Sequence, residues 1–113
     1  MNEWEVYFVA DFAAGKLTWR TRPRSHFIRE QPWKMWNRRF AGKIAGSSDG
    51  IGYQRVEIAN KFYRVHRILF EMANGPIPSH LCIDHIDRNR GNNTLSNLRL
   101  VTPLENARNR SRR

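Results

Sequence analysis

Hydrophobic and polar residues alternate most clearly in the middle of the chain. Over residues 53–58 the apolar side chains Val56 and Ile58 fall on one face of an extended segment. A turn at Asn60 and Lys61 then leads into a second extended segment over residues 62–65. Two such segments joined by a short polar turn predict a β-hairpin.

A helical spacing follows the hairpin directly. Val65, Ile68, Leu69 and Met72 recur at i, i+3, i+4 and i+7, which is one apolar stripe of an α-helix. The pair Gly75-Pro76 supplies the residues that end helices. The pattern therefore predicts an amphipathic helix that ends at about residue 75.

The N-terminal stretch is less regular. Residues 6–9 predict a strand or a short buried segment, residues 11–15 a turn, and residues 17–20 a short strand. Residues 21–39 mix Arg, Pro and Trp, and we interpret them as a basic loop. Trp33 and Trp36 in this loop either stack on nucleic-acid bases or pack against the core, and we favour packing.

The last third predicts a strand, a loop, a strand and a helix. Residues 81–86 and 98–101 have strand character, and the polar residues 87–94 lie between them. Thr102, Pro103 and Glu105 then predict a helix start, with a capping box and proline at the first helical position. We expect an α+β fold: a β-rich, basic part with one helix over residues 1–75, and a second unit over 76–113 with an arginine-rich tail, together one compact domain.

Charge is the strongest compositional signal. The 113 residues carry a formal net charge of +10, and 16 of the 20 basic residues are arginine, whose planar fork suits phosphate. Nine basic residues lie in 16–43 and seven in 88–113, each block with one acid. This distribution favours a polyanion-binding surface over a merely solubilising one. We find no membrane-length apolar run, and the single Cys82 excludes an internal disulfide and a multi-cysteine zinc site, so we expect a reducing cytoplasm.

Asp84 and His85 are adjacent in the first strand of the C-terminal unit, and Asn106 and Asn109 share one face of its helix. A carboxylate and an amide oxygen are hard ligands that suit Mg²⁺ or Mn²⁺. A neutral histidine beside such an ion is a suitable general base. Each residue also has an ordinary structural role: an Asp-His pair is often a turn cap beside a surface ring, and we interpret Asp87 as a loop cap.

The order of these residues resembles the HNH endonucleases of phages and of intron-encoded homing enzymes. The resemblance extends weakly to the N-terminal part, through residues 11–19 and 42–53. It rests most specifically on the following segments: His66-Arg67-Ile68, Gly75-Pro76-Ile77-Pro78, Ile83-Asp84-His85-Ile86-Asp87, Asn92-Asn93, Ser96-Asn97-Leu98-Arg99, Val101-Thr102 and Glu105-Asn106.

This resemblance implies a ββα-metal unit over residues 76–113 that hydrolyses DNA with one divalent ion. Carried over by position, His85 is the general base, Asn97 orients it, and Asp84 and Asn106 hold the ion, with Asn109 as the alternative ligand on the helix. Many members carry histidine where this chain has Asn106, and that difference favours Mg²⁺ or Mn²⁺. The implied products are 5′-phosphate and 3′-hydroxyl ends.

Double-stranded DNA is the implied partner. One site per chain cuts one strand, so a double-strand break needs a homodimer or a second encounter. If a phage encodes the chain, it acts in the cytoplasm of the bacterial host. We expect phosphate contacts from the arginines of both basic blocks: Arg20, Arg22, Arg24, Arg38, Arg39, Arg88, Arg90, Arg99, Arg108 and Arg110.

Two other functions fit the charge equally well. One is a nucleic-acid-binding protein without catalysis, and the other is a basic structural module of a larger assembly. The joint presence of Asp84, His85, Asn97 and Asn106 favours the nuclease.

Overall fold

The computed structural model describes residues 3–111, with the side chains of residues 3–109. Its elements, in chain order, are η1 (Glu3–Val6), β1 (Phe8–Asp11), β2 (Lys16–Trp19), η2 (Arg24–His26), α1 (Glu30–Phe40), β3 (Ile44–Ala45), β4 (Ser47–Ser48), β5 (Gln54–Ile58), β6 (Lys61–Arg64), α2 (Val65–Asn74), β7 (Cys82–His85), η3 (Leu95–Asn97), β8 (Leu98–Val101) and α3 (Pro103–Ser111). The predicted α+β class is confirmed.

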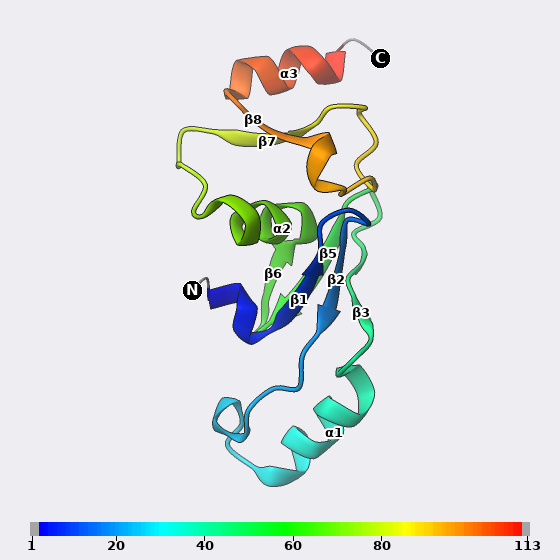
Figure 1. Ribbon diagram of the computed structural model, residues 1–113, viewed down its shortest axis with the longest axis vertical. Coiled ribbons are helices and arrows are strands. Elements are labelled where there is room, and N and C mark those ends of the chain that lie inside the picture. The colour runs from blue at the N-terminus through cyan, green and yellow to red at the C-terminus, as the bar shows by residue number, and fades with distance from the viewer. Residues whose placement is uncertain (1–2, 112–113) are drawn as a thin grey trace.

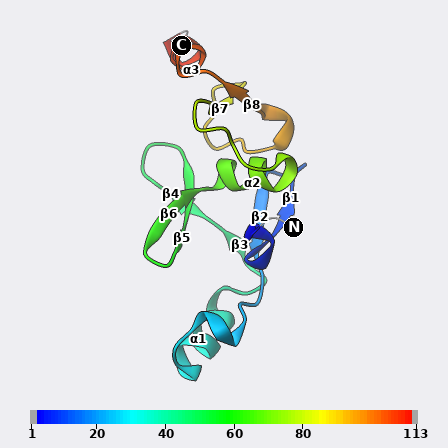
Figure 2. The same ribbon diagram turned by 90° about the vertical axis from the view of Figure 1, so that its left-hand side faces the viewer.

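Three small antiparallel sheets form the framework, with strand orders β1-β2-β3, β4-β5-β6 and β7-β8. The molecule is elongated, with extents of 50 × 28 × 25 Å. α1 lies at one end of the long axis and α3 at the other, and α2 lies between the β7-β8 hairpin and the other two sheets (Figures 1 and 2). No helix of the described part is long and apolar enough to span a membrane.

The main core forms where α2 packs against the first two sheets. The predicted helix is confirmed as Val65–Asn74, and its stripe residues Val65, Ile68 and Leu69 are buried. The stripe meets residues of both sheets, because alternate positions of each strand face it. These partners are Phe8, Leu17, Trp19, Ala45, Val56 and Ile58.

The predicted hairpin is confirmed as β5 and β6, but two N-terminal predictions need correction. The first strand covers Phe8–Asp11 rather than residues 6–9, because residues 3–6 form η1. The interpretation of residues 21–39 as a loop is wrong from Glu30 onward, where α1 forms. Its first turn contains Pro32, a position that tolerates proline because the amide there needs no intrahelical partner.

The inner face of α1 has a helical spacing, contrary to the loop predicted for this segment. Trp33, Trp36, Asn37 and Phe40 lie at i, i+3, i+4 and i+7. Trp36 meets Trp19 edge-on, with 5.1 Å between ring centroids, and also contacts Phe40. The Trp33 indole N–H donates to the carbonyl of Arg22 at 2.8 Å. Both tryptophans therefore pack against the protein, as favoured from the sequence.

The C-terminal unit has the predicted order of strand, loop, strand and helix. The register of β7 and β8 places Asp84 opposite Arg99 and His85 opposite Leu98. The capping box at the start of α3 is confirmed: Glu105 accepts from the Thr102 backbone N–H at 2.8 Å, and its own N–H donates to Thr102 Oγ1 at 3.2 Å. This cap fixes the direction in which α3 leaves the hairpin.

Candidate functional site

A narrow cleft opens where the end of β7 meets one face of α3. Asp84 and His85 both border it, although neighbouring strand residues point to opposite faces, because they lie at the end of the strand. The predicted residues Asp84, His85 and Asn106 are therefore brought together. The complete lining is Tyr53, Ile83, Asp84, His85, Arg88, Arg90, Asn106 and Asn109.

Asp84 is a buried carboxylate, with only 4% of its surface exposed. Arg99 contacts its Oδ2 through Nε at 3.0 Å and Nη2 at 2.9 Å, a pairing that follows from the strand register. The Asn109 amide donates to Oδ1 at 2.8 Å and to Oδ2 at 2.9 Å. Oδ1 thus accepts from one donor atom where Oδ2 accepts from three, so Oδ1 has more room for a further ligand.

The two asparagines of α3 differ in their partners. Asn109 donates to Asp84, and its Oδ1 accepts from Arg88 Nε at 3.3 Å. Asn106 lies one turn earlier on the same helix face and lines the same cleft. Within residues 3–109, no hydrogen bond engages the Asn106 side chain. The amide oxygen of Asn106 is therefore more available to bind a metal ion than the amide oxygen of Asn109.

His85 is buried, with 5% of its surface exposed, and its ring orientation is held by a side chain from the loop. Nε2 lies 2.9 Å from Oδ1 of the buried Asn93. Because an amide oxygen only accepts, Nε2 carries the proton in this bond and Nδ1 keeps its lone pair. Asn93 belongs to the polar loop that the sequence predicts over residues 87–94. Nothing in the local sequence separates it from Asn92.

Asn97 and Asp87 together brace the loop that follows His85. Asn97 Oδ1 accepts from the Asp87 backbone N–H at 3.0 Å, and its amide donates to Asp87 Oδ1 at 2.9 Å. Hydrogen bonds from the Asn92 side chain, the Asn89 backbone and Asn97 hold the pKa of Asp87 below its usual value. Asp87 caps the loop, as predicted, and is not among the residues that line the cleft.

His66 is a buried residue of α2 that lies beside His85. Its ring meets the His85 ring edge-on, with 4.9 Å between centroids, and Tyr53 packs nearby. Burial, the positive charge that His85 can carry, and nearby arginines lower the pKa of His66 to about 3. His66 therefore stays neutral at physiological pH. Its buried Nδ1 has no hydrogen-bond partner among the described residues. His80, in contrast, is exposed and outside the cleft lining.

The predicted phosphate-binding arginines lie either at the cleft or on the exposed surface of the protein, apart from Arg22. Arg88 and Arg90 line the cleft. The guanidinium carbon of Arg90 lies 4.9 Å from the centroid of the Tyr53 ring, and the guanidinium group donates to the Ile51 carbonyl. Arg99 is half-exposed and forms an ion pair with Asp84. The remaining predicted arginines with described side chains are exposed, apart from Arg22: Arg20, Arg24, Arg38, Arg39 and Arg108. The side chain of Arg110 lies outside the described residues.

Arg22 is placed differently from the other arginines. Its guanidinium carbon lies 4.7 Å from the Phe27 ring centroid and 5.0 Å from that of Trp36, and Nε donates to His26 Nδ1 at 3.2 Å. Burial lowers its pKa from the usual value. A phosphate would compete with these contacts for the same guanidinium group.

The oxygen donors around the cleft fit a hard divalent ion such as Mg²⁺ or Mn²⁺ better than they fit zinc. Among the described residues there is no cluster of three or more His, Cys, Asp or Glu side chains that could hold a metal ion. Mg²⁺ does not need such a cluster, because it typically binds through one or two carboxylates, waters and substrate phosphates. Asp84 supplies the carboxylate and Asn106 an amide oxygen.

Comparison with known proteins finds relatives that match this part of the chain. Residues 63–108 match the HNH endonuclease family. An uncharacterized HNH endonuclease of Acanthamoeba polyphaga mimivirus is 49% identical over 49 residues, which are 42% of this chain and 26% of that protein. Protein 3.8 of Escherichia phage T7 is 50% identical over 52 residues, 43% of each chain. The chain thus spans between about a quarter and two fifths of these relatives.

The fold has a counterpart among solved structures. The HNH homing endonuclease I-HmuI, in a structure described as showing DNA binding and cleavage, superimposes with a TM-score of 0.60. The match covers 94% of this chain and 52% of that one, at 22% identity. It therefore extends the similarity in fold beyond residues 63–108 to nearly the whole chain.

Proposed function

We propose that the chain, whose residues 63–108 match the HNH endonuclease family, is a metal-dependent endonuclease that nicks or cuts double-stranded DNA. One observation carries the proposal: Asp84, His85 and Asn106, which are far apart in the chain, border a single cleft with Arg88 and Arg90 beside them. A hydrolytic site for phosphodiesters needs this combination of oxygen donors, a base and cations.

His85 is the general base of the proposed reaction. Its Nε2–H is held by Asn93, which leaves the Nδ1 lone pair to take a proton from water. The oxygen of that water forms a new bond to phosphorus, the bond from phosphorus to the 3′ oxygen breaks, and the released 3′ oxygen takes a proton from solvent water. The products then carry 5′-phosphate and 3′-hydroxyl ends. Asn97 contributes by fixing the loop that starts directly after His85.

Asp84 and Asn106 are the residues that would hold the divalent ion, and we propose Mg²⁺ or Mn²⁺. Such an ion, when bound, neutralises charge on the phosphate and on the leaving oxygen. Asn109 keeps the Asp84 carboxylate in place through its amide, so we assign it a positioning role in preference to that of ligand. Arg88 and Arg90 supply positive charge for the DNA backbone at the cleft.

The arginines at the cleft and those on the exposed surface hold the DNA. They contact its phosphates, and such contacts position the duplex without reading its sequence. One cleft per chain cuts one strand, so a double-strand break requires a homodimer or a second binding event. A cytoplasm that contains the target DNA is the compartment we propose.

A plasmid-nicking assay tests this function. With Mg²⁺, supercoiled DNA should relax to the open circle, and EDTA should stop the reaction. His85→Ala should slow nicking by about 10²- to 10⁴-fold, the usual contribution of a general base. DNA affinity should stay unchanged, as measured by fluorescence anisotropy. Equal nicking by parent and His85→Ala would show that the base assignment is wrong.

A non-catalytic DNA-binding protein is the alternative, and the Asp84–Arg99 ion pair is the observation that favours it. This pair occupies the carboxylate that the ion requires. The same assay separates the two functions, because a binding protein shifts DNA mobility and leaves the plasmid supercoiled at every Mg²⁺ concentration.

A further inference from the structure

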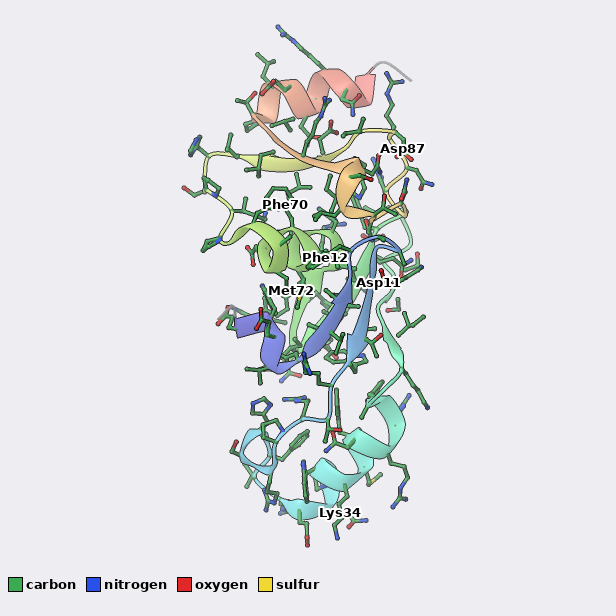
Figure 3. All side chains as sticks on the ribbon, viewed as in Figure 1. Asp11, Phe12, Lys34, Phe70, Met72 and Asp87 are labelled. Atoms are coloured by element: carbon green, nitrogen blue, oxygen red, sulfur yellow. The ribbon has the colours of Figure 1, made fainter. Side chains whose placement is uncertain are left out.

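The turn between β1 and β2 touches the loop that carries Asn93. The Phe12 carbonyl, directly after β1, accepts from the Leu95 backbone N–H at 2.9 Å. Figure 3 labels Asp11 and Phe12 at this tip, and the segment that contains η3 lies directly beside it. Residues 12–15 lie far outside the matched segment 63–108, so the family assignment says nothing about them.

Gly15 makes the tightest part of this contact. It is buried and has a φ of +69°. A Cβ at this position would lie 2.4 Å from both the Asn93 carbonyl carbon and the Thr94 nitrogen. Both of these atoms belong to the backbone, so no side chain can rotate away. Gly42, in contrast, has a similar φ of +80° and nothing within 4 Å of its added Cβ.

The contact continues from Gly15 to the proposed base. The backbone of Asn93 packs against Gly15, and its buried side chain accepts the hydrogen bond from His85 Nε2 at 2.9 Å. An ordinary van der Waals contact begins at 3.4 Å, so a Cβ on Gly15 would push the Asn93 backbone by about 1 Å. A shift of that size takes a 2.9 Å hydrogen bond beyond its useful length.

We propose that Gly15 is a positioning residue: by letting the β1–β2 turn approach the backbone of Asn93, it sets the orientation of the His85 imidazole. The catalytic consequence rests on the proposed nuclease function. Gly15 touches neither substrate nor metal and acts only through Asn93. Misplacing a reacting group by about 1 Å costs roughly 100-fold in rate.

The first test uses single-turnover cleavage with four variants. Gly15→Ala should slow cleavage by roughly 100-fold at saturating DNA and leave the DNA dissociation constant unchanged. Gly42→Ala imposes a similar backbone strain without the clash, so it should cleave at nearly the parental rate. Asn93→Ala should be slow, and the double variant Gly15→Ala/Asn93→Ala should be no slower than Asn93→Ala alone. Multiplied effects in the double variant would overturn the proposal.

Long-range ¹H–¹⁵N NMR of the His85 ring gives a second readout that needs neither DNA nor metal. Parent and Gly42→Ala should show the tautomer protonated at Nε2, and Gly15→Ala a mixture of the two tautomers. If the parent fails to nick DNA, the proposed function fails while this spectrum still decides the role of Gly15. A parental His85 spectrum in Gly15→Ala would refute it.

A milder variant covers the case in which Gly15→Ala does not fold, as judged by circular dichroism. Leu95→Pro removes the N–H that donates to Phe12, at the first residue of η3, where proline is tolerated. The preceding Thr94 already has the extended conformation that proline requires. Leu95→Pro should produce the same tautomer mixture and a smaller loss of rate. An unchanged His85 spectrum in this variant would also count against the proposal.

Discussion

The two ends of the molecule use their charged side chains in opposite ways. At the cleft end, Asp84 is hydrogen-bonded to Arg99 and Asn109, and the exposed Asp87 is hydrogen-bonded to the loop it caps. At the other end, the arm (residues 20–40, including α1) leaves Arg38 and Arg39 exposed on the helix surface. Figure 3 shows Lys34 of the arm at the pole opposite α3.

This contrast indicates which residues should control the cleavage rate and which should control the affinity for DNA. A side chain that takes part in chemistry must be held in one geometry by its neighbours, whereas a phosphate contact tolerates mobility. We therefore expect substitutions at the cleft to change the cleavage rate, and substitutions on the outer face of the arm to change DNA binding.

The largest effect is expected at Asp84. Asp84→Asn keeps the shape of the side chain and removes its charge, so the proposed ion would lose the one carboxylate among the described residues that line the cleft. Cleavage should fall by roughly 10²- to 10⁴-fold, because the proposed ion would supply several kcal/mol of transition-state stabilisation. The measurement is nicking over a range of Mg²⁺ concentrations. Parental cleavage at ordinary Mg²⁺ would remove Asp84 from the site and erase the proposed difference between the two ends.

The next effect is on stability and comes from His66 behind the cleft. Its pKa is about 3 in the folded protein, against 6.5 when exposed. Below pH 6.5 the unfolded state binds the extra proton and the folded state does not, so stability is complete above pH 6.5 and falls as the pH drops toward 3. At pH 4.5 the loss is roughly 3 kcal/mol.

His66→Phe should abolish that part of the pH dependence. Urea unfolding at pH 7.0 and 4.5 measures it, and the parent should lose more stability between the two than the variant does. Equal losses would mean that His66 is protonated in the folded state, contrary to its burial.

The arm should control affinity. Replacing Arg38 and Arg39 together by alanine removes two exposed cations, which should lower the slope of log affinity against log salt by about 2. The rate at saturating DNA should stay parental. Anisotropy titrations at about 50 to 200 mM salt measure the slope, and an unchanged slope would place the DNA away from the arm.

The smallest effect separates Arg22 from its neighbours on the arm. Arg22→Lys keeps the charge but loses the planar contacts with Phe27 and Trp36, so the protein should lose about 1 kcal/mol of stability. Thermal unfolding measures this loss, and the salt dependence of binding should not change. A shallower salt slope with unchanged stability would instead make Arg22 a phosphate contact.

Local patterns predicted the elements of the cleft end well. The stripe from Val65 to Met72 and the capping box of Thr102 and Glu105 each involve residues within eight positions of one another, so the sequence alone indicates them. α1 had an equally local signal in Trp33, Trp36, Asn37 and Phe40. Pro32 and the many arginines of this segment favoured the prediction of a loop. Proline in a first turn is nevertheless compatible with a helix.

Long-range partners were beyond prediction from the sequence. The choice of Asn93 over Asn92 as the partner of His85 depends on the course of the whole loop and on the approach of Gly15. The pairing of Arg99 with Asp84 depends on a strand register that loop length does not fix. Such contacts require the folded chain, because residues remote in sequence create them.

The most direct measurement of the central claim is anomalous diffraction from crystals grown or soaked with Mn²⁺. We expect a single strong peak in the cleft, between the carboxylate of Asp84 and the amide oxygen of Asn106. Arg99 should either move away from the Asp84 carboxylate or contact it together with the ion. Crystals at saturating Mn²⁺ that show no peak there, with the Asp84–Arg99 pair intact, would contradict it.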